Sequence, residues 1–165
     1  MYFEYMYMLR STRMQLTKVS DYSLRVLVYL ALHSGRPVSI REISRAYGVS
    51  AHVIVKVVQH LIAGGVVASV RGRQGGLVLD RAPESIRVGE IVRRTEPTWT
   101  LVECFDQATN TCPIEPACGL KGVLSRAQRA FLEVLDGCTL ADLLPRPAAV
   151  KRLLRVLPAG RESHA

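Results

Sequence analysis

The sequence predicts a mainly α-helical fold with one small β-hairpin. Three observations carry this prediction. Apolar residues recur at helical spacing through the first half of the chain, and helix-capping residues precede these stretches. Two short β-rich runs then flank a glycine-rich turn, and a long amphipathic stretch follows near the C-terminus. A chain of 165 residues is long enough for one modest domain with an appended helical arm.

The first predicted helix begins at a cap on Thr17 or Ser20 and ends near Gly35. A capping box at Ser39 and Glu42 starts a second, shorter helix. In this motif the serine hydroxyl and the glutamate carboxylate each accept a hydrogen bond from a backbone amide that the helix start leaves unpaired. The first two helices are therefore predicted from local signals alone.

Gly48 ends the second helix, and Ser50 caps a third helix that runs to about residue 63. The apolar stripe predicted for this third helix consists of Ile54, Val57, Val58, Leu61 and Ile62. Residues 66–70 and 77–79 follow as the strands of a hairpin. A helix, a helix–turn–helix and a hairpin in this order form a winged helix-turn-helix domain.

The next predicted element is a linking helix at 86–95, which ends before Glu96 and Pro97. A loop with three cysteines follows, and then a long helix at 120–135 and a last helical turn at 139–144. The long helix is expected to be the dimerisation helix, and its apolar side carries Val123, Leu124, Ala127, Phe131, Val134 and Leu135.

These elements divide the chain into four segments. We expect a disordered extension at 1–13 with Met14 as the functional start, and a winged helix-turn-helix domain at 14–83. The linking helix, cysteine loop and dimerisation helix occupy 84–144, and a basic tail occupies 145–165. The roles of this tail and of the first segment are left open.

The net charge of +8 is unevenly distributed. Residues 14–82 hold nine Lys and Arg against three Asp and Glu, whereas residues 83–144 hold six against nine. A basic first half beside an acidic middle favours a polyanion-binding module joined to a second function. No apolar run approaches the roughly 20 residues of a membrane-spanning helix, and the N-terminus lacks the order of a signal peptide. We therefore expect a cytoplasmic protein that does not bind membranes.

A recognition helix enters the major groove of double-stranded DNA by its N-terminal end, so its base-facing residues lie in the first turns, opposite the core stripe. The residues in these outward positions are Ala51, His52, Lys56, Gln59 and His60. The amide and hydroxyl of Ser50 suit a phosphate at the positive end of the helix. The predicted hairpin turn adds Arg71, Arg73 and Gln74, and arginines on a thin turn suit a narrow minor groove. A solvated helix face would explain Lys56 alone equally well, but the winged-helix context favours DNA binding.

Cys104, Cys112 and Cys118 are separated by seven and five residues. Zinc ribbons use closely spaced cysteine pairs, which are absent from this stretch. In a reducing compartment, three thiolates on one loop favour an iron–sulfur cluster, with buried free thiols or a thiol switch as alternatives. Cys138 would lie about 24 Å from Cys118, at the other end of the long helix. We expect it to be a small core residue.

No arrangement of Ser, His and Asp suggests catalysis, and the four histidines lack the spacing of metal ligands. The glycine-rich turn is not followed by the Gly-Lys-Ser/Thr of a nucleotide-binding loop. We therefore expect a DNA-binding protein rather than an enzyme.

The chain resembles the NsrR group of nitric-oxide-sensing repressors, within the larger family that includes IscR. The resemblance rests on MQLTKVSDYSLRVLVYLA, YGVS, VRGRQGGLVL and VECF…CP…PACGLK…FLEVLDGCTLADL. It implies a homodimer, with the long helix as the dimer interface and a cluster in the loop. A dimer with two recognition helices needs pseudo-palindromic operator DNA. It also implies a fourth cluster ligand from the partner subunit, which matches Asp21 in this sequence.

Subgroups of this family differ at two positions. IscR-like members carry a histidine three residues after the third cysteine, where this chain has Lys121, so a [4Fe-4S] cluster is expected rather than a two-iron form. RirA-like iron-responsive members share the cysteine intervals but tend to lack the early aspartate, so Asp21 favours nitric oxide. The expected function is a repressor that releases operator DNA when nitric oxide nitrosylates its cluster. An iron-responsive regulator and a zinc or thiol-switch DNA-binding protein are the alternatives.

Overall fold

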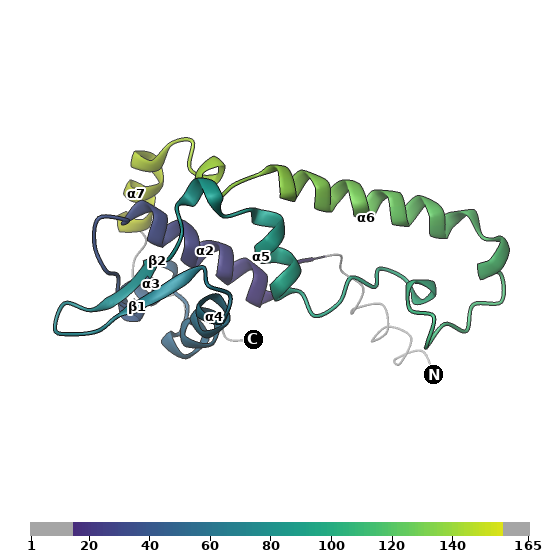
Figure 1. Ribbon diagram of the computed structural model, residues 1–165, viewed down its shortest axis with the longest axis horizontal. Helices are drawn as coiled ribbons and strands as arrows, with labels where there is room; N and C mark the ends of the chain where they lie inside the picture. The colour runs from purple at the N-terminus through teal and green to yellow at the C-terminus, as the bar shows by residue number, and fades with distance from the viewer. Residues whose placement is uncertain (1–14, 157–165) are drawn as a thin grey trace.

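The computed structural model describes residues 15–156, so the expected extension at 1–13, Met14 and the tail from 157 onward lie outside the described residues. The helices and strands, in chain order, are α2 (Lys18–Leu32), α3 (Ile40–Tyr47), α4 (Ala51–Ala63), β1 (Val67–Val70), β2 (Gly76–Leu79), α5 (Val88–Thr95), α6 (Gly119–Gly137) and α7 (Pro147–Val156). Figure 1 shows a compact body from which α6 extends as an arm. The mainly helical class with one hairpin is therefore confirmed.

The compact body is a winged helix-turn-helix domain built around α2. This helix packs against α4, α5 and β2, and α3 packs against α4. The core comes from the apolar stripes of these helices, and its fully buried members include Leu27, Leu30, Ile43, Ile54 and Ile91. Burying such stripes is the main source of stability for short helices, which are marginal alone in water.

The helix starts follow the predicted capping residues. The Thr17 hydroxyl accepts a hydrogen bond from the Ser20 amide, so Thr17 is the cap of α2. The Ser39 hydroxyl accepts one from the Glu42 amide at 3.1 Å. α2 ends at Leu32, slightly earlier than predicted.

The predicted capping box is only half formed. The carboxylate of Glu42 does not turn back to the Ser39 amide; it accepts hydrogen bonds from the Arg36 guanidinium and from the Tyr29 hydroxyl, the latter at 3.0 Å. A charged partner binds a carboxylate more strongly than a backbone amide does, which explains the departure.

The hairpin pairs β1 with β2 in antiparallel register, with Val67 opposite Leu79 and Val70 opposite Gly76. Val38 extends the sheet, because its amide donates to the Leu77 carbonyl at 3.0 Å and its carbonyl accepts from the Leu77 amide at 2.8 Å. This pairing anchors the base of the wing to the segment before α3.

The stripe of α4 is buried at four of its five predicted positions. Ile62 is the exception, because 41% of its surface is exposed. It lies about 100° around the helix from Leu61, which turns it away from the core. Including it in the stripe was wrong.

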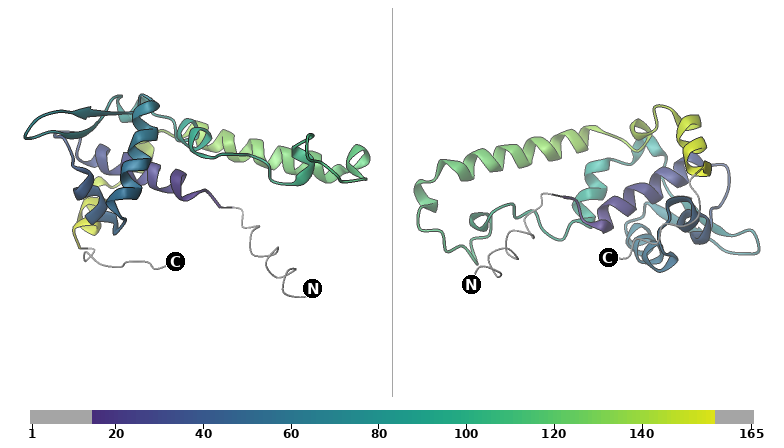
Figure 2. Two further views of the ribbon diagram at one scale, coloured as in Figure 1. Left: turned by 90° about the horizontal axis from the view of Figure 1, so that it is seen from below. Right: turned by 180° about the vertical axis from the view of Figure 1, so that it is seen from behind.

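After the wing, α5 begins later than predicted, and α7 was not predicted. α5 starts at Val88, because Ile86 and Arg87 are extended and pair with the segment after α6, where Arg87 lies opposite Thr139. α7 lies in the segment assigned to a basic tail; it starts at Pro147, a residue suited to the first helical position, and packs against α3. In Figure 1 and in the right view of Figure 2, α7 lies above α2 and α4 lies below it.

Within residues 15–156, no single helix is long and apolar enough to cross a membrane. α3 and α4 reach the length and apolar composition of a membrane span only when they are taken together, and the chain bends by 119° between them.

Candidate nucleic-acid interface and cysteine loop

The exposed face of α4 carries the residues predicted to contact DNA. His52, Lys56, Gln59 and His60 are all exposed, opposite the buried stripe. Ser50 caps the helix by accepting a hydrogen bond from the Val53 amide at 3.4 Å. The N-terminal end of α4 is therefore positively polarised and lies beside exposed hydrogen-bond donors. This arrangement suits contacts to DNA phosphates and base edges.

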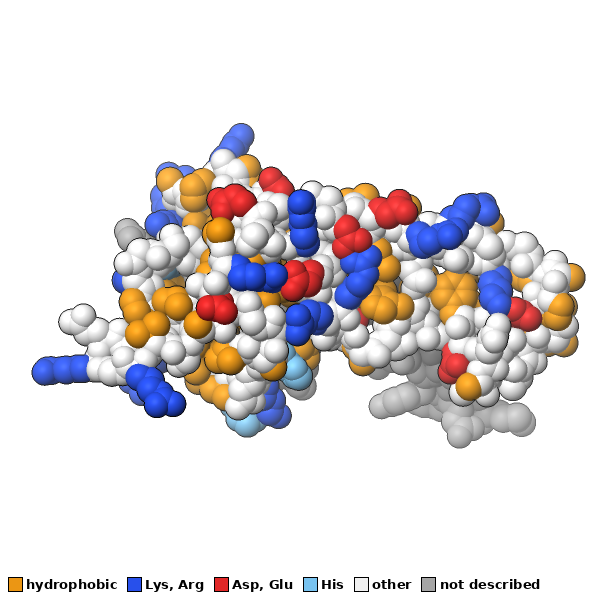
Figure 3. Space-filling view, in the orientation of Figure 1, with side chains coloured by type: hydrophobic (Ala, Val, Ile, Leu, Met, Phe, Trp, Pro, Cys, Tyr) orange, Lys and Arg blue, Asp and Glu red, His pale blue; other side chains and the backbone are white. Residues whose placement is uncertain are grey.

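The wing presents Arg71, Arg73 and Gln74 to solvent. Its turn depends on glycine: Gly72 has φ +113°, and a Cβ on Gly75 would lie 2.3 Å from the Val70 carbonyl oxygen. Figure 3 shows Lys and Arg side chains at the end of the hairpin, beyond the body of the domain. A thin turn with cationic ends can enter a narrow groove.

The three clustered cysteines lie on the segment between α5 and α6. Cys104 is in a short 3-10 turn at Glu103–Phe105, and Cys118 directly precedes α6. Cys112 lies between them, and its amide donates to the Asn110 side-chain oxygen at 3.1 Å. All three are half-buried free thiols.

Hydrogen bonds within the loop give it a definite path. The Thr111 hydroxyl donates to the Glu103 carboxylate at 2.6 Å, and the Thr111 amide donates to the same oxygen. These bonds lower the pKa of Glu103. The Thr109 hydroxyl donates to Asp106 at 2.8 Å. Residues 103–112 are thus closed into a compact turn with a thiol at or near each end.

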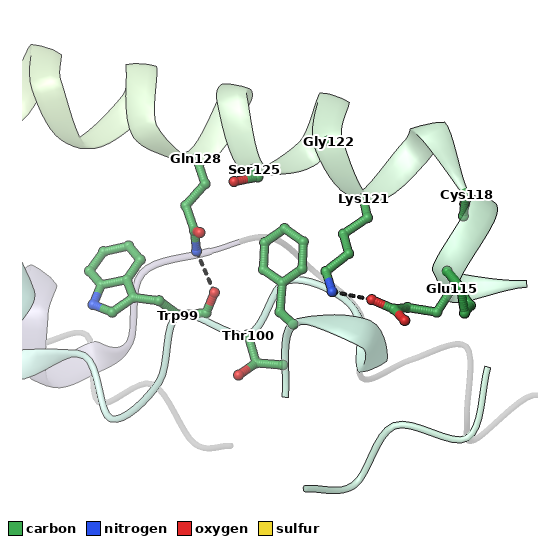
Figure 4. A pocket seen from close by; sticks show the side chains of 10 residues that line it. Trp99, Thr100, Glu115, Cys118, Lys121, Gly122, Ser125 and Gln128 are labelled. Atoms are coloured by element: carbon green, nitrogen blue, oxygen red, sulfur yellow. Dashed lines mark hydrogen bonds and ion pairs between the residues drawn. The ribbon is translucent and has the colours of Figure 1, made fainter. Parts of the chain in front are cut away.

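Lys121, on the first turn of α6, points to Glu115 on the loop (Figure 4). The pKa of Lys121 is raised, chiefly by its hydrogen bond and ion pair with Glu115 and further by the charge of Cys104. Lys121 stands at the position where IscR-like members carry a histidine, and it therefore places a cation beside the cysteine loop.

An open pocket of about 750 Å³ lies between this loop and α6. Cys118, Glu115 and Lys121 line one end and Trp99 and Gln128 the other, where the Gln128 amide donates to the Trp99 carbonyl (Figure 4). The cysteine loop is thus held against α6 at two separate points.

Across residues 15–156, no three His, Cys, Asp or Glu side chains approach closely enough to hold a metal ion. Cys104, Cys112 and Cys118 therefore do not form a metal site among the described residues of this structure. Asp21 lies on the first turn of α2, where its carboxylate is paired with Arg25 at 2.7 Å and its side chain is 44% exposed. Cys138 is half-buried at the C-terminal end of α6, away from Cys118.

Glu96 is a residue of this region whose role the sequence did not predict. Its carboxylate accepts hydrogen bonds from the Thr17 amide at 2.8 Å, from the Thr17 hydroxyl at 3.1 Å and from the fully buried Ser20 hydroxyl. Glu96 therefore ties the N-terminus of α2, next to Asp21, to the start of the cysteine segment. A partner 79 residues away leaves no local sequence signal.

The dimerisation helix predicted from the sequence keeps its apolar side uncovered in the single chain. None of the 19 residues of α6 is buried, and its exposed large apolar side chains are Leu120, Val123, Phe131 and Val134. Val134 is 66% exposed. An apolar stripe of this length on a solvated helix is typical of an interaction surface.

The Rrf2 family model, described as "Iron-dependent Transcriptional regulator", matches residues 16–146. The chain is an Rrf2-family transcriptional regulator. NsrR of Bacillus licheniformis is 44% identical over 142 residues, which cover 86% of this chain and 99% of that protein. NsrR of Bacillus subtilis is 44% identical over 144 residues, covering 87% and 99%. The expected resemblance to the NsrR group is confirmed, and this Rrf2 regulator is a DNA-binding regulator rather than an enzyme.

Solved structures of Rrf2-type regulators have the same fold. The structure of T. potens IscR has a TM-score of 0.64 and 32% identity, covering 79% of this chain and 86% of that one. CymR, the global cysteine regulator of B. subtilis, has a TM-score of 0.63 and 27% identity, covering 79% and 96%. The family match ends at residue 146, so α7 lies beyond it.

Proposed function

We propose that this Rrf2 regulator is a homodimeric repressor whose operator binding depends on an iron–sulfur cluster and is relieved by nitric oxide. The observation that carries the proposal is the placement of three free, half-buried thiols on one segment between α5 and α6. This segment joins the DNA-binding domain to the arm. A chemical change at these thiols can therefore alter how the DNA-binding domain and the arm are held relative to each other.

The donor set fits a cluster by its chemistry. Cys104, Cys112 and Cys118 would supply soft thiolates, and Asp21 of the partner subunit would supply a harder carboxylate oxygen. In the single chain Asp21 faces solvent from an exposed ion pair, so a second subunit can reach it. When bound, a [4Fe-4S] cluster would supply the iron at which nitric oxide reacts.

The chain's own residues would link that site to DNA. The apolar side of α6 would pair with its copy and hold two winged domains at a fixed separation. Two α4 helices would then enter successive major grooves of a pseudo-palindromic operator, roughly 34 Å apart. Ser50, His52, Lys56, Gln59 and His60 would contact DNA from α4, and Arg71, Arg73 and Gln74 from the wing.

The test begins with DNA selected by the anaerobically purified protein from a random-sequence duplex pool. Iron and sulfide content, visible absorbance and affinity for the selected duplex are then measured before and after nitric oxide is added. We expect a coloured protein that loses affinity at least tenfold with nitric oxide. A colourless protein, or affinity that is unchanged by nitric oxide and by cluster removal, would contradict the proposal.

Single cysteine variants assign the ligands. Cys104→Ala, Cys112→Ala and Cys118→Ala should each lose the colour and the tight binding. Cys138→Ala is the matched control, because this thiol lies at the other end of α6, and it should keep both. Asp21→Ala should retain a cluster whose reaction with nitric oxide changes in rate. Loss of colour in Cys138→Ala would overturn this ligand assignment.

A second candidate is an iron-responsive regulator, which the description of the family as iron-dependent favours. Binding to the same selected duplex distinguishes the iron-responsive regulator from the nitric-oxide-sensing repressor. An iron-responsive regulator should release DNA when a chelator removes iron and should respond weakly to stoichiometric nitric oxide. A colourless protein that contains zinc would instead support a zinc or thiol-switch regulator.

A further inference from the structure

The arm meets the winged domain where the C-terminal end of α6 crosses α5 (Figure 1). Gly89 of α5 is buried at this crossing. A Cβ at this position would lie 2.0 Å from the Asp136 carboxylate oxygen and 2.9 Å from the Asp136 backbone nitrogen. Real Cβ atoms do not approach other atoms this closely, so the observed crossing requires glycine.

An ion pair closes over the same crossing. The Arg93 guanidinium holds both oxygens of Asp136, with Nη2 at 2.6 Å from Oδ2. The hydrogen bonds raise the pKa of Arg93 and lower that of Asp136. Arg93 is one turn after Gly89 on the same face of α5. The Asp136 side chain is therefore fixed against two successive turns.

Backbone pairing completes the junction. The Val88 amide donates to the Cys138 carbonyl at 2.9 Å, and the Leu140 amide donates to the Ile86 carbonyl at 2.8 Å. Ile86 and Leu140 are each 1% exposed. This end of the arm is thus fixed to the core of the domain, while the rest of α6 leaves its apolar side uncovered.

We propose that Gly89, Arg93 and Asp136 are positioning residues that set the angle of the arm and hence the operator spacing that the dimer prefers. The inference rests on the proposed dimer through α6. Because α6 spans about 28 Å, a tilt of roughly 10° at the junction shifts its far end by about 5 Å. That shift exceeds the roughly 3.4 Å rise per base pair of DNA, so a small change of angle changes the spacing at which both recognition helices fit.

Gly89→Ala is the direct test, with Gly137→Ala as the matched control. A Cβ on Gly137 meets nothing within 4 Å, although this residue is on α6 next to Asp136. Alanine favours helices more than glycine does, so Gly89→Ala should keep α5 helical and displace only the crossing. Affinities are measured for the selected duplex, for a single half-site, and for duplexes with one base pair added or removed between half-sites.

We expect Gly89→Ala to remain dimeric and to bind the half-site within twofold of the unmodified protein. Its affinity for the full duplex should fall at least tenfold and recover in part on a duplex of altered spacing. Gly137→Ala should behave as the unmodified protein. An unchanged spacing preference in Gly89→Ala, or an equal loss on half-site and full duplex, would overturn the inference.

Asp136→Asn and Arg93→Gln keep the inference testable if Gly89→Ala does not fold. Each removes the charge pair without adding bulk, and each should weaken full-duplex binding several-fold while leaving half-site binding intact. If both variants retain full affinity and spacing preference, the junction does not set the angle. If the unmodified protein is monomeric and gains nothing from a second half-site, the proposed dimer fails instead.

Discussion

Replacing Glu96 tests whether the contact between α2 and the cysteine segment stabilises the domain. In Glu96→Ala, the Thr17 amide and the Thr17 and Ser20 hydroxyls lose a shared charged acceptor. A hydrogen bond to a charged group contributes about 1.5–3 kcal/mol. The three bonds end on one oxygen, and the Ser20 hydroxyl keeps Thr95 at 2.7 Å, so the loss should be near that of one bond.

We therefore expect Glu96→Ala to lower the free energy of unfolding by about 2 kcal/mol. For a chain of this length, that corresponds to a fall in Tm of roughly 4–8 °C. Glu96→Gln keeps an oxygen acceptor without the charge and should lose about half as much. The assay is urea and thermal unfolding followed by circular dichroism at one fixed protein concentration, because a dimer's stability depends on concentration.

Glu84→Ala is the matched control for Glu96→Ala. Glu84 is exposed in the turn before α5 and has no hydrogen bond or ion pair to another described residue. Its replacement should change the free energy of unfolding by less than about 0.5 kcal/mol. If Glu96→Ala proves as mild as this control, the reasoning from the α2 contact is refuted.

Three more perturbations have defined outcomes. Phe131→Asp places a charge on the apolar side of α6 and should yield monomers or insoluble protein in sedimentation; a soluble, DNA-binding dimer would exclude this interface. Arg73→Ala should reduce the slope of log affinity against log salt by about one for each half-site, and an unchanged slope would remove the wing from DNA contact. The pKa of Glu42 is lowered, chiefly by its hydrogen bond from Arg36. The stability this pair contributes should be present above the unfolded-state pKa of Glu42 and lost as the pH falls through the folded-state pKa. In an Arg36→Gln variant, the free energy of unfolding should fall less on acidification than it does in the unmodified protein. An equal fall in the two proteins would contradict this ion pair as the source of the pH dependence.

Local signals in the sequence predicted most of the fold. Ser39, Gly48 and Ser50 each act within one helical turn of their own position, so the helix ends they set can be read from the chain. The glycine-rich turn of the wing and the amphipathic period of α6 are equally local. The three clustered cysteines could be recognised as candidate ligands because their type and spacing are properties of the sequence.

The sequence by itself thus determined the winged-helix class, the order of its elements and the residue types offered to DNA and to a cluster. Only the tertiary structure decided which distant groups meet: Glu96 with the start of α2, Gly89 with Asp136, and α7 with α3. Caps and turns depend on neighbours within a few residues, whereas Glu96 and Thr17 are 79 residues apart and α3 and α7 are farther apart still. Such contacts form only when the buried stripes of several helices fix their mutual angles, and no local pattern encodes those angles.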